Sequence, residues 1–326
     1  MTEPNISMTH GRRLLRLADF REFMIIAIIL AAGTAMAIHS PAFLTPENLS
    51  VILLAVAVQA IVAIGMTILL ISGGFDLSVG STAGLTGAVT AIALVNGLPV
   101  PLAIAAGLGL GALVGLANGL IVAKVGINAF ITTLGMMGIV RGALEVITQG
   151  KNVYGLPESF KAIGQGKLAG VQAPILICLA LIVLGDLALR KMRFFRQNYY
   201  VGGNEKAAVL SGIRVNRIKI FNYALTGLLA GVAGVLMTAR FGSASVTMGT
   251  GLELQVISAV IIGGASLQGG EGTVLGSFLG CILMALIVTS LNLLGVDVYW
   301  QRLIIGATLL AAVLIDTLGK RLRRGA

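Results

Sequence analysis

RKMRFFRQNYYVGGNEKAAVLSGIRVNRIK, residues 190–219, is the longest charged run in a chain of 326 residues that is otherwise strongly apolar. The stretch carries eight basic residues and one acid, Glu205. In a membrane protein, short loops with an excess of lysine and arginine stay on the cytoplasmic side. The stretch therefore predicts a chain that is threaded through a membrane, with residues 190–219 as a cytoplasmic loop.

The composition of the whole chain indicates the same class. Hydrophobic residues make up 57% of the sequence and charged residues 11%, whereas a soluble domain has about 25% charged residues. The net charge of +10 is concentrated near the two ends of the chain and in residues 190–219, where basic residues fix membrane topology. We therefore predict an all-α polytopic protein in the lipid membrane, with no nucleic-acid partner.

A membrane-spanning helix needs about 20 mainly apolar residues, and ten segments approach or reach that length. They are residues 22–40, 49–71, 77–96, 101–123, 127–148, 173–189, 220–239, 252–262, 273–294 and 299–318. Ten crossings place both termini and residues 190–219 in the cytoplasm and leave residues 149–171 as an external loop, which gives a strong positive-inside bias. Residues 1–326 are expected to form one transmembrane domain.

Two glycine-rich stretches, residues 73–81 and 263–272, interrupt the apolar pattern. Each opens with Gly-Gly and carries one acid, which fits either an ancient duplication or two independent turns. A re-entrant half-helix at either break is the alternative to a full span. Glycines spaced four apart from Gly107 to Gly119 predict close packing between helices in lipid.

The basic loop contains a candidate short helix. Asn204 is a capable N-cap, and Ala207, Leu210 and Ser211 fall on one helical face. A small-residue face of this kind, held at the membrane surface, is suited to docking into a groove of another protein. The alternative is a solvated loop that only sets the topology.

The sequence carries no arrangement of residues that is typical of an enzyme. A phosphate-binding loop with a Walker lysine, a paired-histidine metal signature and a nucleophile elbow are all missing from it. Cys178 and Cys281 lie in apolar runs, where cysteines are usually buried structural thiols. We therefore expect a non-catalytic chain without a bound metal or cofactor, and ATP hydrolysis would belong to a partner.

Polar residues within the predicted spans are candidates for function. Arg141 and Glu145 lie four residues apart, and they are expected either to neutralise each other or to form a functional site. Asp76 follows Gly-Gly and is expected to cap backbone amides or to N-cap the next helix rather than to bind a proton. Uncharged groups suit either a passage for a hydroxyl-rich solute or contacts between helices; they are Asn118, Asn128, Thr132, Thr133, Asn292 and Gln301.

At these residues the chain resembles a known family, the membrane permease subunits of ribose-type ABC sugar importers. The resemblance covers nearly the whole chain, with matching stretches in order and at the expected spacing. Asn128 departs from the family, which more often has proline before the Ala-Phe. The stretches are GGFDLSVG (73–80), GLANG (115–119), FITTLG (130–135), GGNEKAA with SGI (202–208, 211–213) and GLEL continuing to GGASLQGGEG (251–254, 263–272).

The resemblance implies a non-catalytic subunit of the bacterial inner membrane. Two copies would form the pathway, a cytoplasmic ATPase would bind ATP and Mg²⁺, and a periplasmic or extracellular binding protein would deliver a neutral monosaccharide or polyol. The short helix would then be the coupling helix that contacts the ATPase, through Asn204, Glu205, Ala207, Ala208, Leu210, Ser211 and Gly212. Candidates for the translocation path are Asp76, Ser78, Asn118, Phe130, Thr132, Thr133 and Asn292.

Two other classes of function compete with this hypothesis. An autonomous ion-coupled carrier would use Asp76, Glu145 and Arg141 as coupling groups. A channel or a purely structural membrane protein would depend neither on ATP nor on a binding protein. The helix in the basic loop separates these alternatives, because a secondary carrier needs no docking helix there.

Overall fold

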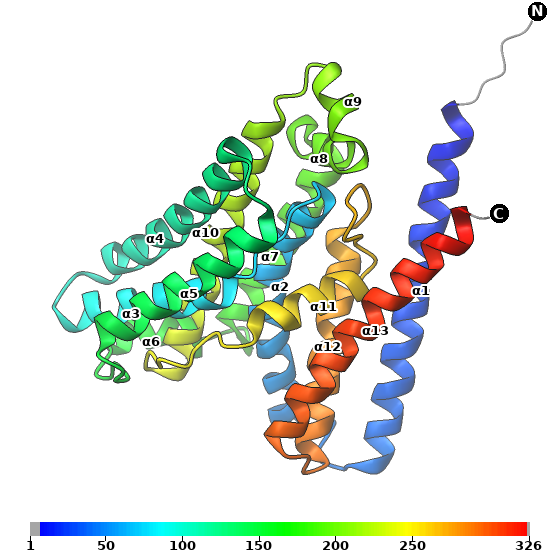
Figure 1. Cartoon of the computed structure of the whole chain (residues 1–326). Helices are drawn as coiled ribbons and strands as arrows, with labels where there is room; N and C mark the ends of the chain where they lie inside the picture. The colour runs from blue at the N-terminus through cyan, green and yellow to red at the C-terminus, as the bar shows by residue number, and fades with distance from the viewer. Residues whose placement is uncertain (1–6, 325–326) are drawn as a thin grey trace, which may run out of the picture.

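The computed structural model describes residues 7–324, and the chain is almost entirely helical (Figure 1). Ten apolar helices correspond to the ten predicted spans. They are α1 (Ser7–His39), α2 (Pro46–Ile71), α3 (Val79–Val95), α4 (Val100–Leu120), α5 (Ala129–Thr148), α7 (Ala173–Lys191), α10 (Val215–Phe241), α11 (Leu252–Ile262), α12 (Val274–Leu293) and α13 (Val298–Arg324). The all-α polytopic fold is confirmed.

The remaining elements are short and lie between the spans. A π-helical turn, η1 (Ile121–Val125), extends α4, and α8 (Arg193–Gly203) and α9 (Glu205–Leu210) form within the basic loop. The predicted external loop folds into α6 (Glu158–Gln165) and a two-stranded antiparallel hairpin, β1 (Lys167–Leu168) and β2 (Val171–Gln172). In the part of the chain that the structure describes, seven helices are long and apolar enough to cross a membrane, and α3, α11 and the segment Val298–Leu314 of α13 are shorter apolar helices.

The core forms around α2 and α10. Most of α2 is buried among other helices, whereas residues Glu22–His39 of α1 leave most of their surface exposed, as a lipid-facing helix does. The predicted glycine row of α4 lies against α10: a Cβ at Gly119 would come within 2.8 Å of the Ile220 Cα. The small residues therefore let these two helices approach to backbone contact, as the spacing predicted.

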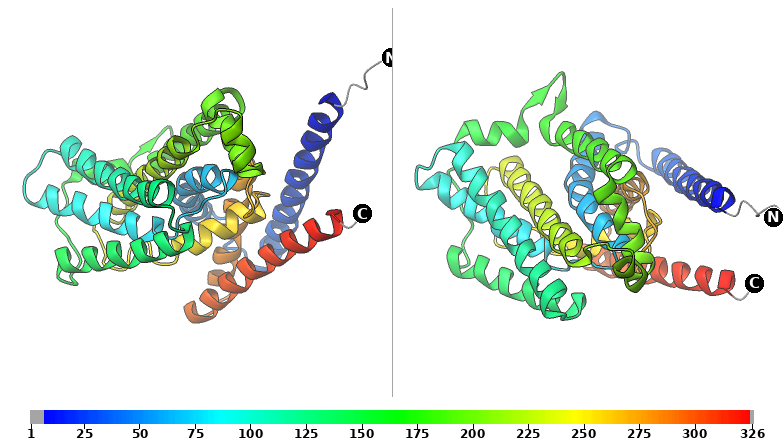
Figure 2. Two further views of the ribbon diagram at one scale, coloured as in Figure 1. Left: turned by 45° about the horizontal axis from the view of Figure 1, so that its top comes forward. Right: turned by 90° about the horizontal axis from the view of Figure 1, so that it is seen from above.

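The helices are arranged so that α8 and α9 lie at one end of the molecule (Figure 1). α1 begins and α13 ends toward that same end, and the turns that join α1 to α2 and α12 to α13 lie at the other (Figure 1). Seen from above, α8 and α9 cover the ends of α2 and α10 (Figure 2). This arrangement agrees with a threading that places both termini on the side of the basic loop.

Residues 242–251, which join α10 to α11, form a non-helical segment that sequence analysis did not single out. We call it the inserted segment. Its Ala244 pairs with Val153 of the external loop, and its Gly249 lies in backbone contact with Gly80 in the first turn of α3. The segment therefore runs from the external loop into the helix bundle, where α11 begins.

Candidate functional site

The basic loop folds as α8, α9 and the first turns of α10. Asn204 Oδ1 accepts a hydrogen bond from the Ala207 amide at 3.0 Å, which is the geometry of an N-cap. Gly212 has a φ of +80°, a left-handed conformation that favours glycine, and it ends the helix. The short helix predicted between Asn204 and Gly212 is therefore present.

The two faces of α9 have different surroundings. Ala208 is 3% exposed and packs in a small apolar cluster with Val201, Val215 and Ile218. Leu210 is 89% exposed on the opposite side, and Glu205, Ala207 and Ser211 are exposed as well. Ala208 therefore anchors the helix to its own subunit, although the sequence placed it among the contacts with a partner.

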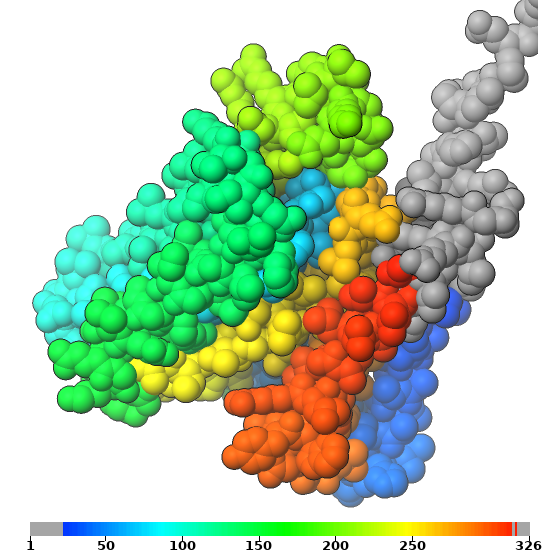
Figure 3. All heavy atoms as spheres, in the orientation of Figure 1, coloured from blue at the N-terminus to red at the C-terminus, as the bar shows by residue number. Residues whose placement is uncertain are grey.

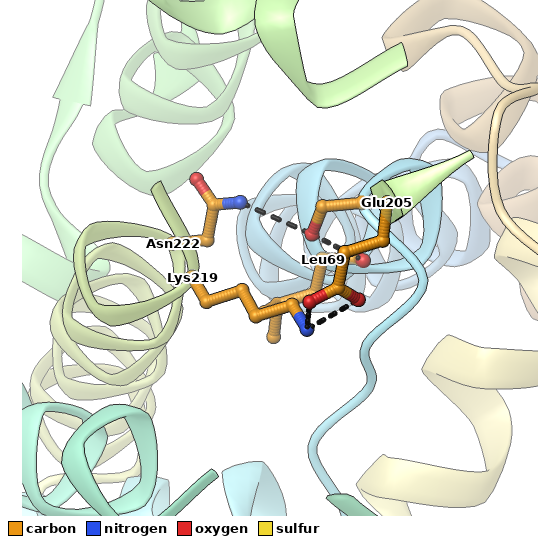
Figure 4. A network of polar contacts seen from close by, with 5 residues as sticks. Leu69, Glu205, Lys219 and Asn222 are labelled. Atoms are coloured by element: carbon orange, nitrogen blue, oxygen red, sulfur yellow. Dashed lines mark hydrogen bonds and ion pairs between the residues drawn. The ribbon is translucent and has the colours of Figure 1, made fainter. Parts of the chain in front are cut away.

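An ion pair connects α9 to α10, and a buried amide connects α10 to the end of α2 (Figure 4). Lys219 Nζ lies 2.8 Å from both carboxylate oxygens of Glu205. One turn further along α10, Asn222 is fully buried, and its Nδ2 donates to Asn198 Oδ1 at 2.7 Å and to Ser72 Oγ at 3.1 Å. Ser72 Oγ in turn donates to the Leu69 carbonyl at 2.8 Å. α10 is thus bonded both to α8 and to the end of α2.

Backbone contacts strengthen the same junction. The Gly270 amide donates to the Ile71 carbonyl at 2.8 Å, and Gly202 packs against both of these groups so closely that a Cβ there would collide with them. Tyr199 OH donates to the Gly272 carbonyl at 2.8 Å, and burial raises the pKa of its phenol, which keeps the donor protonated. We call this junction the α8 joint; its residues are Ile71, Ser72, Asn198, Tyr199, Gly202, Asn222, Gly270 and Gly272.

Three of the predicted path residues meet in a buried cluster. Asp76 Oδ1 accepts from the Ser78 amide at 2.7 Å and from Ser78 Oγ at 2.6 Å, and Asp76 Oδ2 accepts from Asn118 Nδ2 at 3.1 Å. All three side chains are almost completely buried. Asp76 caps a backbone amide as expected, but the N-cap of α3 is Ser78 rather than Asp76, because α3 begins at Val79.

The other predicted path residues are dispersed. On α5, Thr133 is buried and donates to the Ala129 carbonyl of its own helix, Thr132 is nearly buried, and Phe130 is half exposed beside the Phe75 ring. Asn292 is exposed where α12 turns into α13, and its Oδ1 accepts from Gln301 Nε2 at 2.8 Å. Asn292 therefore braces a turn rather than joining the Asp76 cluster.

The expected pair of Arg141 and Glu145 does not form. Arg141 Nη1 donates to the carbonyls of Val246 and Met248, both at 3.0 Å, and Glu145 is exposed without an ion pair in the described part of the chain. The reason is that the inserted segment has carbonyls without helical partners, and a buried carbonyl must find a donor. Arg141 supplies that donor across the bundle.

Comparison with known proteins gives consistent matches over the length of the chain. A family profile described as "Branched-chain amino acid transport system / permease component" matches residues 48–313. The chain is 42% identical over 320 residues to the Ribose import permease protein RbsC of Escherichia coli (strain K12), covering 97% of this chain and 99% of that protein.

Two further relatives support the match. The Ribose import permease protein RbsC of Bacillus subtilis (strain 168) is 40% identical over 304 residues, covering 92% of each chain. The L-arabinose transport system permease protein AraH of Escherichia coli (strain K12) is 38% identical over 321 residues, covering 98% of this chain and 96% of that protein. No solved structure matches the chain significantly.

Proposed function

We propose that this chain, which belongs to the family of transport-system permease components, is the membrane subunit of an ATP-binding-cassette importer for a neutral monosaccharide or polyol. It is a multi-pass protein of the bacterial cytoplasmic membrane. The substrate class is supported by the compared relatives, which are named for ribose and L-arabinose. ATP and Mg²⁺ would be bound by a separate ATPase subunit.

The observation that carries the coupling part of the proposal is the exposure of Leu210 on a helix that is otherwise held firmly. Leu210 is not exposed alone, because its neighbour Val209 is 56% exposed, and adjacent exposed apolar side chains on a basic loop support a protein contact. Ala208, Asn204 and the Glu205–Lys219 ion pair fix the helix that presents them. We infer that α9 docks into the ATPase through Leu210, Ala207 and Ser211.

The mechanism follows from what α9 is bonded to. Closure of the ATPase pair on ATP would displace α9, and the packing of Ala208 against Val215 and Ile218 would pass that displacement to α10, with a small contribution from the Glu205–Lys219 pair. The α8 joint would pass it to the end of α2 through Asn222 and Gly270. Because α2 and α10 form the core, their movement would alternate access to the path between two copies of the chain, which a sugar-binding protein loads from outside.

The ion-coupled carrier receives less support. It requires Asp76, Glu145 and Arg141 to act together, but Asp76 is bonded to Ser78 and Asn118 while Arg141 is bonded to the inserted segment. The three side chains do not form one site in the structure.

The test compares two exposed leucines on opposite sides of the protein. Leu210→Glu should abolish co-purification with the ATPase and ATP-driven ribose uptake, whereas Leu168→Glu in the external hairpin, where Leu168 is also exposed, should preserve both. Both variants should insert normally, because neither side chain is buried. Ribose uptake by Leu210→Glu at the wild-type rate would overturn the proposed docking helix.

A further inference from the structure

The inserted segment lies at membrane depth although it is not a helix. α3 and α10 run side by side, with Ala83 against Gly234 and Gly87 against Thr238. Gly80, which contacts Gly249 of the segment, lies one helical turn before Ala83 and therefore beside the middle of α10. The segment thus reaches the interior of the bundle from the external side.

The buried side of the inserted segment is fully accommodated by the protein. Ala244, Met248 and Gly249 are buried, and the carbonyls of Val246 and Met248 accept from Arg141. The Val246 amide donates to Asn152 Oδ1 at 3.2 Å. Non-helical backbone is tolerated at membrane depth only where it is buried in protein or lines a water-filled cavity, and this side satisfies the first condition.

The other side of the segment carries exposed hydroxyl groups. Thr247 and Thr250 are exposed, and Ser245 Oγ lies 3.1 Å from Thr247 Oγ1. Exposed residues on the outer helices are instead large and apolar, such as Leu113 on α4 and Leu184 on α7, as contact with lipid requires. The hydroxyls therefore indicate a surface that meets water rather than lipid. This side of the segment thus fits the other permitted setting, the wall of a water-filled cavity.

The space-filling view shows where this surface lies. Residues near 250, coloured yellow, form a band on the front face between the green of α5 and the orange-red of α13 (Figure 3). Arg141 of α5 holds the segment along one border of that band. The band contains α11 and the inserted segment that precedes it, and the segment joins this face to the external loop through Asn152.

We propose that residues 245–250 of the inserted segment contact the sugar during its passage, through the hydroxyls of Ser245, Thr247 and Thr250. This inference rests on the proposed function. A hydroxyl both donates and accepts hydrogen bonds, so these side chains can replace water around a neutral, hydroxyl-rich solute. Hydrogen bonds from a few neutral hydroxyls are weak enough for the solute to leave again, and passage requires such release. Asp76, Ser78 and Asn118 are almost completely buried and hydrogen-bonded to one another, so they support the path from behind rather than touch the sugar.

Cysteine labelling tests whether the segment faces water. Thr247→Cys and Thr250→Cys, each made in the full chain in native membrane vesicles, are treated with a charged, membrane-impermeant methanethiosulfonate. The native Cys178 and Cys281 are buried and give little background. Leu184→Cys on α7 is the matched control for an exposed position in lipid. Because the thiolate is the reacting species and forms in water, the threonine positions should label at least about tenfold faster, and ribose should slow that labelling.

Uptake tests whether the hydroxyls themselves matter. The double variant Thr247→Val/Thr250→Val keeps the shape of both side chains but removes the hydroxyls, and it should lower ATP-driven ribose uptake about fivefold or more, since lost solute hydrogen bonds are not replaced. Thr247→Ser/Thr250→Ser restores the hydroxyls and should keep uptake within about twofold of the wild type.

The outcomes separate this inference from the proposed function. Labelling of both cysteines as slowly as Leu184→Cys overturns the inference whatever the uptake shows, and so does wild-type uptake by the double valine variant. Fast labelling that ribose slows supports it. A wild-type complex that binds its ATPase but takes up neither ribose nor arabinose counts against the proposed substrate class instead.

Discussion

The α8 joint and the inserted segment are both non-lipid junctions within a membrane bundle, but they are built in opposite ways. The joint is closed: Asn222 is fully buried, Gly202 fits only because it lacks a side chain, and Gly270 bonds directly to Ile71. The inserted segment is half open, with Arg141 behind it and hydroxyls in front. The closed junction suits transmission of force, and the half-open one suits contact with a solute.

The largest effect is expected at Gly202. A Cβ there would lie 2.5 Å from the Gly270 nitrogen and collide with the Ile71 carbonyl, so Gly202→Ala should destabilise the protein by about 3 kcal/mol and abolish uptake. The neighbouring Gly203 is the matched control, because a Cβ there meets nothing within 4 Å. Thermal unfolding in detergent measures both variants, and equal unfolding temperatures would show that the joint is not closely packed.

The next effect is expected at Arg141. Arg141→Met leaves the carbonyls of Val246 and Met248 without their donor, and unsatisfied buried acceptors cost about 1–3 kcal/mol. The variant should unfold at a lower temperature, and protease should cut within residues 242–251 more rapidly. Glu145→Gln is the control: Glu145 is exposed, so its loss should change neither measurement. A larger effect of Glu145→Gln would restore the Arg141–Glu145 pair as a hypothesis.

A change at Asn222 distinguishes the coupling of ATP hydrolysis to transport from the folding stability of the chain. Asn222→Leu breaks the bonds to Asn198 and Ser72 at a cost of about 1–2 kcal/mol, while α9 keeps its docking face. The complex should therefore still hydrolyse ATP but transport less ribose per ATP. Thr226→Val, one turn further along α10, removes a hydroxyl that bonds to its own helix and should leave that ratio unchanged. A normal ratio in Asn222→Leu would remove the α8 joint from the mechanism.

The smallest effect is expected for the ion pair. Lys219 and Glu205 are partly exposed, and pairs of this kind contribute about 0–1 kcal/mol. Lys219→Met should thus lower uptake slightly at low salt and not measurably at high salt, because salt screens the pair in the wild type as well. A severe loss at high salt would show that Lys219 has another role.

The sequence predicted the apolar helices and the short helix α9 well because their causes are local. Apolar length placed ten apolar helices, of which seven in the described part of the chain are long enough to cross a membrane. Asn204 and Gly212 placed α9. The bonding partners could not be predicted, because Asn222 meets Ser72 across 150 residues and Arg141 meets Val246 across 105. The predicted Arg141–Glu145 pair was wrong for that reason. Spacing along one helix permits the pair, but Arg141 donates instead to carbonyls of the inserted segment, which is distant in the sequence.

The most direct test of the central claim is ribose uptake into proteoliposomes that contain the purified chain, with and without its co-purified ATPase, loaded with ATP and supplied with the binding protein. Uptake should require both the ATPase and ATP, and Leu210→Glu should reduce it to the background without unfolding the chain. Uptake that proceeds without the ATPase, or that follows an imposed proton or sodium gradient, would contradict the account.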